Sequence, residues 1–148
     1  MKIAIGGDHG GYALKQEIIG YLKAKGHSII DAGCFCSDSC DYPEYGKRVA
    51  ELVGKRSSDR GILICKSGIG LSIVANKVKG VRAASCYNIS QAKSSREHNE
   101  ANVLSLGALY TNKQMSKKIV SAWLKAKPAG GRHSRRVKQI SRIERMQH

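Results

Sequence analysis

The sequence has 148 residues, 41% hydrophobic and 25% charged, a balance that excludes a disordered chain and suits one domain with its own core. Its formal net charge of +15 could serve nucleic-acid binding, but aromatics make up only 5% and no groove-reading or base-stacking motif is present, which argues against it. No apolar run approaches the roughly 20 residues of a membrane span, so we expect a cytoplasmic protein without a membrane partner.

Short β-branched segments alternate with longer segments of helical period along the chain. In chain order, the pattern predicts strand 2–6, helix 11–25, strand 28–31, helix 43–55, strand 61–65, helix 70–77, strand 81–85, helix 90–99, strand 103–106 and helix 111–125. Such alternation predicts right-handed βαβ crossovers. The expected α/β fold is a doubly wound five-stranded parallel sheet, a Rossmann-like three-layer sandwich.

Residues 127–148 extend beyond this predicted sheet. Pro128 and the two glycines that follow it should end the preceding helix. A last helix is predicted over 134–145, with Val137, Ile140 and Ile143 at helical spacing. We therefore interpret 1–148 as one domain in which 127–148 form a connector and an extra C-terminal helix, which docks on the body or on a partner subunit.

The candidate site follows the strand ends, because ligands of an open parallel sheet bind beyond the carboxyl ends of its strands. The first predicted strand leads into Asp8 and His9, and the third ends at Cys65. We expect the helix that ends with His98 and Asn99 to bring these two residues near the same rim.

The turn after Cys65 carries most of the chemical information. Glycines at 68 and 70 let backbone N–H groups converge ahead of a helix, where they would stabilise an oxyanion or a phosphate. A thiol that faces this turn is favoured as a thiolate, although a lone Cys at a strand end could equally be a buried, inert residue. The turn matches neither a Walker loop nor a dinucleotide fingerprint.

Other candidate residues have simpler interpretations as well. Asp8 could cap the helix that follows it, and His98, taken alone, could be a surface side chain. Arg132, Arg135 and Arg136 lie in or just before the last predicted helix, with a spacing suited to an anionic ligand.

Five segments carry a resemblance to a known family: GGDHGGYALK at 6–15, DYPEYG at 41–46, GILICKSGIGLSIVANKVKGVRAA at 61–84, SREHNEANVLSLG at 95–107 and GGRHSRRVKQI at 130–140. Together they resemble ribose-5-phosphate isomerase type B over nearly the whole chain. The resemblance implies interconversion of ribose 5-phosphate and ribulose 5-phosphate through a cis-enediolate, in the pentose phosphate pathway and without metal or cofactor. It also implies a homodimer with sites at the subunit interface, whose dimers could pair into tetramers.

By position, the resemblance implies a role for each candidate residue. Cys65 matches the general base, and Ser67, with the backbone N–H groups up to Gly70, matches the hole for the enediolate oxygen. His98 with Asp8 matches the ring-opening pair. His9, together with Arg132 and Arg136, matches the phosphate clamp. The implied substrate-binding residues are His9, Tyr42, Gly68, Ile69, Gly70, Asn99, Arg132 and Arg136.

Two residues depart from the family pattern. Lys66 stands where glycine is usual, and a positive φ there would strain the lysine; alternatively, its ammonium group could help keep Cys65 ionised. Leu109 stands where an arginine near the phosphate is common. The clamp could therefore be one residue short, unless a residue such as Arg135 compensates.

The cysteines and the substrate leave alternatives open. An odd number of cysteines fits reduced thiols, and the C-x-C-x3-C spacing of Cys34, Cys36 and Cys40 could bind zinc, although no fourth ligand is evident. A six-carbon isomerase acting on allose 6-phosphate or galactose 6-phosphate would need a longer pocket. A basic nucleic-acid-binding module with a degenerate site is the other alternative, and the intact catalytic candidates argue against it.

Overall fold

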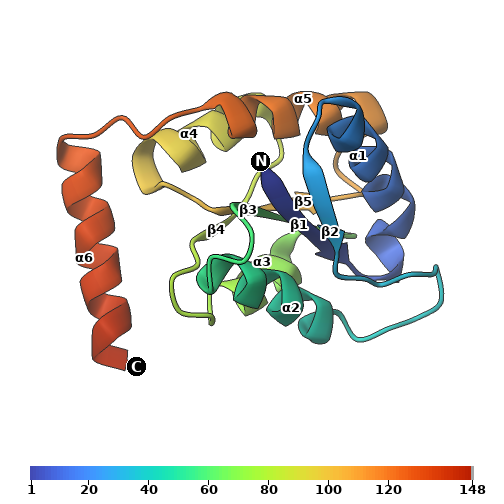
Figure 1. Cartoon of the computed structure of the whole chain (residues 1–148), viewed down its shortest axis with the longest axis horizontal. Helices are drawn as coiled ribbons and strands as arrows, with labels where there is room; N and C mark the ends of the chain where they lie inside the picture. Colours follow the sequence, from blue (N-terminus) through green and yellow to red (C-terminus); the bar gives the residue numbers. More distant parts are fainter. Residues whose placement is uncertain (148) are drawn as a thin grey trace.

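A computed structural model describes residues 1–147. Within these residues, five parallel strands form one sheet in the order β2-β1-β3-β5-β4 (Figure 1). The strands are β1 (Lys2–Gly7), β2 (Ser28–Asp31), β3 (Arg60–Cys65), β4 (Ala83–Ser85) and β5 (Val103–Gly107). The predicted doubly wound parallel sheet is confirmed. We call the edge where the strands end the carboxyl rim, and the opposite edge the amino edge.

Helices cover both faces of the sheet. They are α1 (Tyr12–Ala24), α2 (Tyr42–Gly54), α3 (Ile69–Ala75), α4 (Ile89–Asn99), α5 (Lys113–Lys125) and α6 (Arg132–Gln147), with a short 3-10 helix at His9–Gly11. Figure 1 shows α1, α4 and α5 on one face and α2 and α3 on the other. Among the helices of residues 1–147, none has the length and apolar character that a membrane crossing requires.

The core consists of two clusters, because successive side chains of a strand point to opposite faces. On β1, Ile3 and Ile5 belong to the cluster that contains the fully buried Trp123 of α5, whereas Ala4 belongs to the cluster beneath α2 and α3. Fully burying one such isoleucine contributes roughly 2 kcal/mol. The same alternation on β3 places Cys65 on the α2–α3 face.

Strand β4 is shorter than the sequence pattern predicts. The amide of Arg82 donates to Oδ1 of Asn102 at 2.8 Å, and the amide of Val81 donates to the carbonyl of Val78 at 3.2 Å. Val81 thus still belongs to the preceding turn, and the paired residues of β4 begin at Ala83. A side chain that competes for a backbone amide leaves no signal in hydrophobic periodicity.

Helix α6 stands beside the sandwich (Figure 1) and confirms the predicted extra C-terminal helix. Its Val137 is buried, but Ile140 and Ile143 are 43% and 58% exposed. It contacts α4, and Glu144 accepts a hydrogen bond from the amide of Gly80 at 2.8 Å. Much of the apolar face of α6 is thus uncovered.

Candidate active site

Cys65 ends β3 at the carboxyl rim and is only 6% exposed. Its Sγ accepts a hydrogen bond from the amide of Gly68 at 3.1 Å. Ser67 makes a similar contact, because its Oγ accepts from the amide of Ile69 at 3.2 Å. The thiol and the hydroxyl therefore each accept from an amide of the glycine turn, and the thiol faces this turn as the sequence predicts.

Two serines hold this turn in place. The carbonyl of Gly68 accepts hydrogen bonds from Ser85 Oγ at 2.7 Å and from Ser105 Oγ at 2.6 Å. Gly68 has φ 78°, a left-handed conformation that favours glycine, and an added Cβ would lie 3.0 Å from the backbone of Leu106. The neighbouring strands β4 and β5 thus fix the direction in which the amides point.

Asp8 follows β1 and is buried at the same rim. Its Oδ1 accepts from the amides of Gly10 at 2.9 Å and Gly11 at 3.2 Å, so it caps the short 3-10 helix rather than α1 itself. Glycine is required at Gly7 and Gly11, because a Cβ at either would lie 2.0 to 2.1 Å from the carbonyl oxygen of Ile64. This close approach brings Asp8 beside the end of β3.

His9 and Tyr42 complete the groups at the carboxyl rim. Nδ1 of His9 accepts from the amide of Cys40 at 3.4 Å. The Tyr42 ring lies against Gly70, where an added Cβ would be 2.8 Å from the ring. One chain thus places a thiol, a carboxylate, an imidazole and a phenol at the carboxyl rim.

A second group of candidate residues surrounds the end of α4. The rings of His98 and His133 stack with centroids 4.2 Å apart and planes at 7°, and the amide of Ala129 donates to the carbonyl of Glu97 at 2.9 Å. Burial lowers the pKa of His133 below its ordinary value, and the charges of His98 and of the two arginines of this group lower it further. The basic group consists of His98, Arg132, His133 and Arg136.

Sequence reasoning assigned no role to His133. Its signal is its place in GGRHSRR, next to the candidate arginine Arg132, but only the fold brings it against His98. The two arginines make this surface positively charged, and the stacked histidine rings lie beside them, so that the group could contact an anionic ligand.

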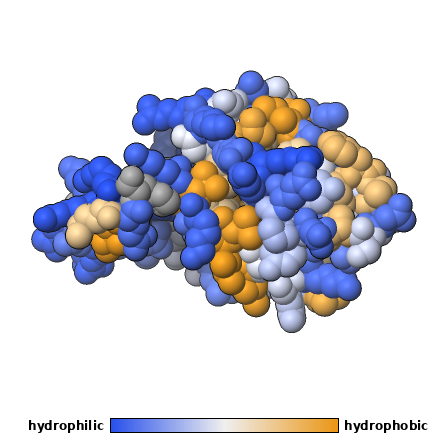
Figure 2. All heavy atoms as spheres, turned by 90° about the horizontal axis from the view of Figure 1, so that it is seen from below, coloured by the Kyte–Doolittle hydropathy of each residue, from blue (hydrophilic) through white to orange (hydrophobic). Residues whose placement is uncertain are grey.

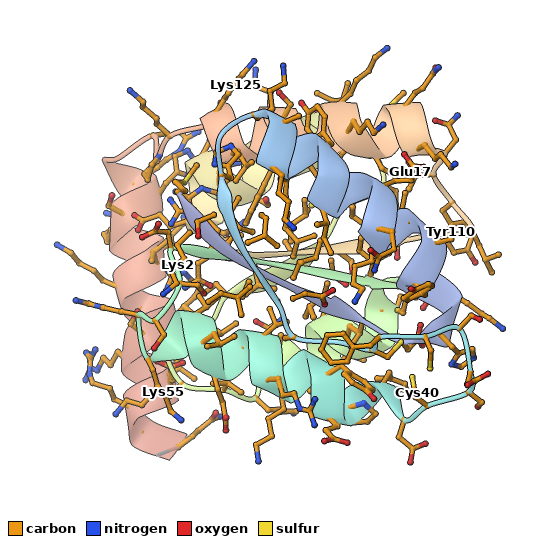
Figure 3. All side chains as sticks on the ribbon, turned by 45° about the vertical axis from the view of Figure 1, so that its right-hand side comes forward. Lys2, Glu17, Cys40, Lys55, Tyr110 and Lys125 are labelled. Atoms are coloured by element: carbon orange, nitrogen blue, oxygen red, sulfur yellow. The ribbon has the colours of Figure 1, made fainter. Side chains whose placement is uncertain are left out.

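The expectation that His98 and Asn99 lie near the rim of Cys65 is wrong within one chain. Helix α4 starts after β4 and runs back across the sheet, so its last residues lie at the amino edge, where Arg82 Nε donates to the carbonyl of Asn99 at 2.9 Å. Figure 3 labels Cys40 and Tyr110 on the side of the carboxyl rim, and α6 stands on the opposite side, near Lys2. The candidate residues form two separate half-sites.

Lys66 is free of the backbone strain that its position suggested. Within residues 1–147, the non-glycine residues with positive φ are Arg56 and Glu100. The side chain of Lys66 is exposed and passes over Gly10, where an added Cβ would lie 2.4 Å from Lys66 Cγ. Its amine therefore belongs to the carboxyl rim, close to the loop of Asp8 and His9.

The three clustered cysteines differ in exposure. Cys34 is buried, Cys36 is exposed and Cys40 is intermediate, and burial together with the neighbouring Cys40 thiol raises the pKa of Cys34. Within residues 1–147, no three His, Cys, Asp or Glu side chains gather as a metal site requires. The zinc interpretation therefore finds no support in the described part of the chain.

A thiol beside a turn of backbone amides, at the carboxyl rim of a parallel sheet, is an arrangement suited to an α/β enzyme that transfers protons. The chain belongs to the Ribose/Galactose Isomerase family, which matches residues 3–140.

Individual relatives match this chain over almost their full length. The chain is 46% identical to ribose-5-phosphate isomerase B of Escherichia coli over 97% of this chain and 96% of the relative. The structure of ribose-5-phosphate isomerase B from Clostridium thermocellum is similar with a TM-score of 0.98, at 51% identity and full coverage of both chains. That of the Mycoplasma genitalium enzyme with bound ribulose-5-phosphate has a TM-score of 0.94, at 42% identity, over 97% of this chain and 96% of that one.

Proposed function

We propose that this protein is an aldose–ketose isomerase that interconverts ribose 5-phosphate and ribulose 5-phosphate, a reaction of the pentose phosphate pathway. The observation that carries the proposal is the 3.1 Å hydrogen bond from the Gly68 amide to Cys65 Sγ, which joins a base to a site for negative charge. The similarity to ribose-5-phosphate isomerases B supports a five-carbon sugar phosphate as substrate.

The proposed reaction starts with the Cys65 thiolate removing the proton from C2 of the open-chain aldose. The resulting cis-enediolate takes this proton at C1, while the hydroxyl proton of O2 moves to O1, so that the products balance the substrate. Negative charge develops on oxygen between the two steps, and Ser67 Oγ with the free amides of the turn would stabilise it. One such donor typically contributes about 3 kcal/mol to lowering a barrier.

Within residues 1–147, the amides of Ser67 and Gly70 lack a hydrogen-bond partner. The amides of Gly68 and Ile69 bond to Cys65 Sγ and to Ser67 Oγ in the absence of substrate. We propose that the two unpaired amides receive the enediolate oxygen, and that the other two keep the base and the hydroxyl in place.

The remaining roles require both half-sites. We propose that Asp8 and His98 open the sugar ring, that Tyr42 and Asn99 contact the sugar, and that His9 binds the phosphate together with two arginines. Because the two half-sites lie at opposite edges of one sheet, a second subunit would supply the missing half. The residues proposed to act in the partner's site are His98, Asn99, Arg132 and Arg136.

Exposed apolar side chains support this homodimer. Ile69 and Ile73 of α3 are 52% and 55% exposed, and Ile140 and Ile143 of α6 are similarly uncovered. Figure 2, which views the side of α2 and α3, shows an apolar patch in the middle of the molecule, with the mostly hydrophilic α6 beside it. Contiguous apolar surface of this kind commonly marks an interface. We propose that α6 packs on the partner subunit across this side.

We also propose a cytoplasmic location. All five cysteines of the chain are free thiols, as is usual for proteins of a reducing compartment.

The test is an isomerase assay with ribose 5-phosphate and with allose 6-phosphate, on wild type, Cys65→Ala and the matched control Cys36→Ala, whose thiol is exposed. We expect turnover of ribose 5-phosphate that Cys65→Ala lowers by at least about a thousandfold and that Cys36→Ala retains. Turnover that survives the loss of Cys65 would exclude it as the base. A higher kcat/KM with allose 6-phosphate would favour the six-carbon alternative.

A further inference from the structure

A cavity of about 540 Å³ opens at the amino edge, away from Cys65. Its walls come from the end of α2, the start of β3, the segment before β4 and the end of α4. Lys2 and Lys55, labelled in Figure 3, mark this end of the molecule, opposite Cys40 and Tyr110. The charged residues among those lining it are Arg56, Arg60, Arg82, Arg96, Asp59 and Glu100.

The four arginines of this cavity lack carboxylate partners. Among residues 1–147, the ion pairs within 4.0 Å are all formed by other residues. Arg82 donates to the carbonyl oxygen of Glu100 at 3.2 Å, and Arg96 donates to that of Ala101 at 2.8 Å. A carbonyl dipole satisfies an N–H donor but does not neutralise a full charge, so the lining keeps an excess of positive charge.

Of the four arginines, Arg96 has the least favourable environment for a charged side chain. It is 6% exposed, and its Nε is buried without a hydrogen-bond partner in the described chain, an arrangement that protein structures rarely tolerate without a bound group or water. Burial, followed by the charge of Arg60, lowers the pKa of Arg96 to about 10. The neighbourhood therefore works against the charged form of this guanidinium.

Helix termini explain only part of this cluster. Cations are favoured near the C-terminal ends of helices, and Arg82 and Arg96 bond to carbonyls at the end of α4. Arg60 makes one local bond, to the carbonyl of Asp59 at 2.7 Å, and Arg56, just past α2, lines the same cavity. The helix C-termini therefore do not account for the remaining N–H donors of Arg56 and Arg60.

We propose that this cavity is a second anion site, which binds the phosphoryl dianion of a small phosphorylated metabolite. Four guanidinium groups against two carboxylates leave two positive charges, which a dianion would balance. Guanidinium forks match the oxygen geometry of phosphate, and the volume falls in the range of small-molecule sites.

The site is separate from the phosphate clamp proposed for catalysis. None of its lining residues belongs to either half-site, yet Arg82 Nε donates to the carbonyl of Asn99. An occupant would therefore contact the segment that carries one candidate substrate residue, without reaching the carboxyl rim of the same chain.

The test measures binding of inorganic phosphate and of glycerol 3-phosphate by isothermal titration calorimetry, at low chloride and pH 8. Two phosphate sites per chain are expected for wild type. We expect phosphate to bind the cavity at least about tenfold more weakly in Arg60→Gln, and likewise in Arg56→Gln, whose side chain is more exposed. Arg136→Gln, in the half-site at the end of α4, should weaken only the phosphate clamp proposed for catalysis. Tighter binding of glycerol 3-phosphate identifies a metabolite, and tighter binding of inorganic phosphate restricts the site to the free ion and overturns the metabolite assignment.

Lys23→Gln, which removes an exposed charge from α1, is the matched control and should bind as wild type does. Unchanged stoichiometry and Kd in both Arg56→Gln and Arg60→Gln would overturn the proposal, as would an equal loss in Lys23→Gln, which would indicate general charge attraction. A lower light-scattering mass of Arg60→Gln would mean that a second chain fills the cavity, and this would also overturn it. The isomerase assay is independent of all these outcomes.

Discussion

The backbone amide of Leu109 donates a hydrogen bond to the carbonyl of Lys66 at 3.0 Å, so that these two exposed residues are neighbours at the carboxyl rim. They are the positions where glycine and arginine are expected by resemblance to the family. The side chain of Lys66 passes over Gly10, next to His9. We infer that this lysine supplies the positive charge that Leu109 does not.

The first prediction concerns this exchange of charge. Lys66→Gly should raise KM for ribose 5-phosphate about fivefold and change kcat less than about twofold, because a partly exposed charge pair contributes ~1 kcal/mol. The double variant Lys66→Gly/Leu109→Arg should recover most of the lost affinity, since it returns a cation to the neighbouring position. Steady-state kinetics at several salt concentrations provide the measurement.

The alternative role of Lys66, to keep Cys65 ionised, gives a different signature. In that case Lys66→Gly would lower kcat and move the pH profile, while KM stayed constant. Lys77→Gly, which alters an exposed lysine after α3, controls for the loss of net charge. An unchanged KM in Lys66→Gly would exclude the phosphate contact.

Much of the carboxyl rim could be predicted from sequence, because it depends on local pattern. Asp8 and Cys65 each follow a short apolar run, and glycines follow both. The placement of His98 failed because the crossover helix of a βαβ unit runs antiparallel to its strands, so that its last turn lies at the amino edge. The stacking of His133 on His98 had no local signal, since only the path of residues 126–131 brings the two rings together.

The second prediction concerns Lys15, which is fully buried. Its Nζ bonds to Asp31 Oδ1 at 2.7 Å and to the carbonyl of Cys34 at 2.5 Å. Lys15→Met would leave the carbonyl of Cys34 without this donor and the Asp31 carboxylate without its cation, with only the Gly33 amide still bonded to Oδ1. We expect it to lower the free energy of unfolding by about 3 kcal/mol. Urea unfolding measures the change, and Lys23→Met, at an exposed position of the same helix, should remain near wild type. Equal stability of the two variants would contradict this account.

The third prediction follows from the lowered pKa of His133, caused by burial and then by His98, Arg132 and Arg136. The unfolded chain binds the proton at the ordinary pKa near 6.5, whereas the folded chain binds it only at lower pH. Unfolding therefore takes up a proton between these two values, and stability falls as the pH falls through this window. This loss of stability is complete at pH values below the pKa of His133 in the folded chain. It is absent at pH values above the pKa of His133 in the unfolded chain.

His133→Gln removes this titration. We expect the difference in unfolding free energy between pH 7.5 and pH 5.5 to be smaller in His133→Gln than in wild type, as measured by urea denaturation at both pH values. His27→Gln, which alters a histidine near the N-terminus, is the control for a general loss of histidine. Identical pH dependence of wild type and His133→Gln would refute the assignment.

The fourth prediction tests whether two chains share each active site. Cys65→Ala and His98→Ala should each be inactive as homodimers, because every site then lacks one group. If the half-sites combine in trans, a mixed dimer contains one site with both defects and one intact site. Random exchange of subunits makes half of the dimers mixed, so the mixture should recover about a quarter of the wild-type activity.

Sites built within one chain would behave differently, because each site of a mixed dimer would keep one defect and the mixture would stay inactive. The matched control mixes Cys65→Ala with Asp8→Ala, two changes in the same half-site. Their mixed dimers have one defect in each site, so recovery should be absent even when subunits exchange. Recovery in the first mixture and none in the second would place His98 in the partner's site, whereas equal recovery in both would reject the shared site. Light scattering must show a mass above that of one 16.1 kDa chain, since a monomer could not share a site at all.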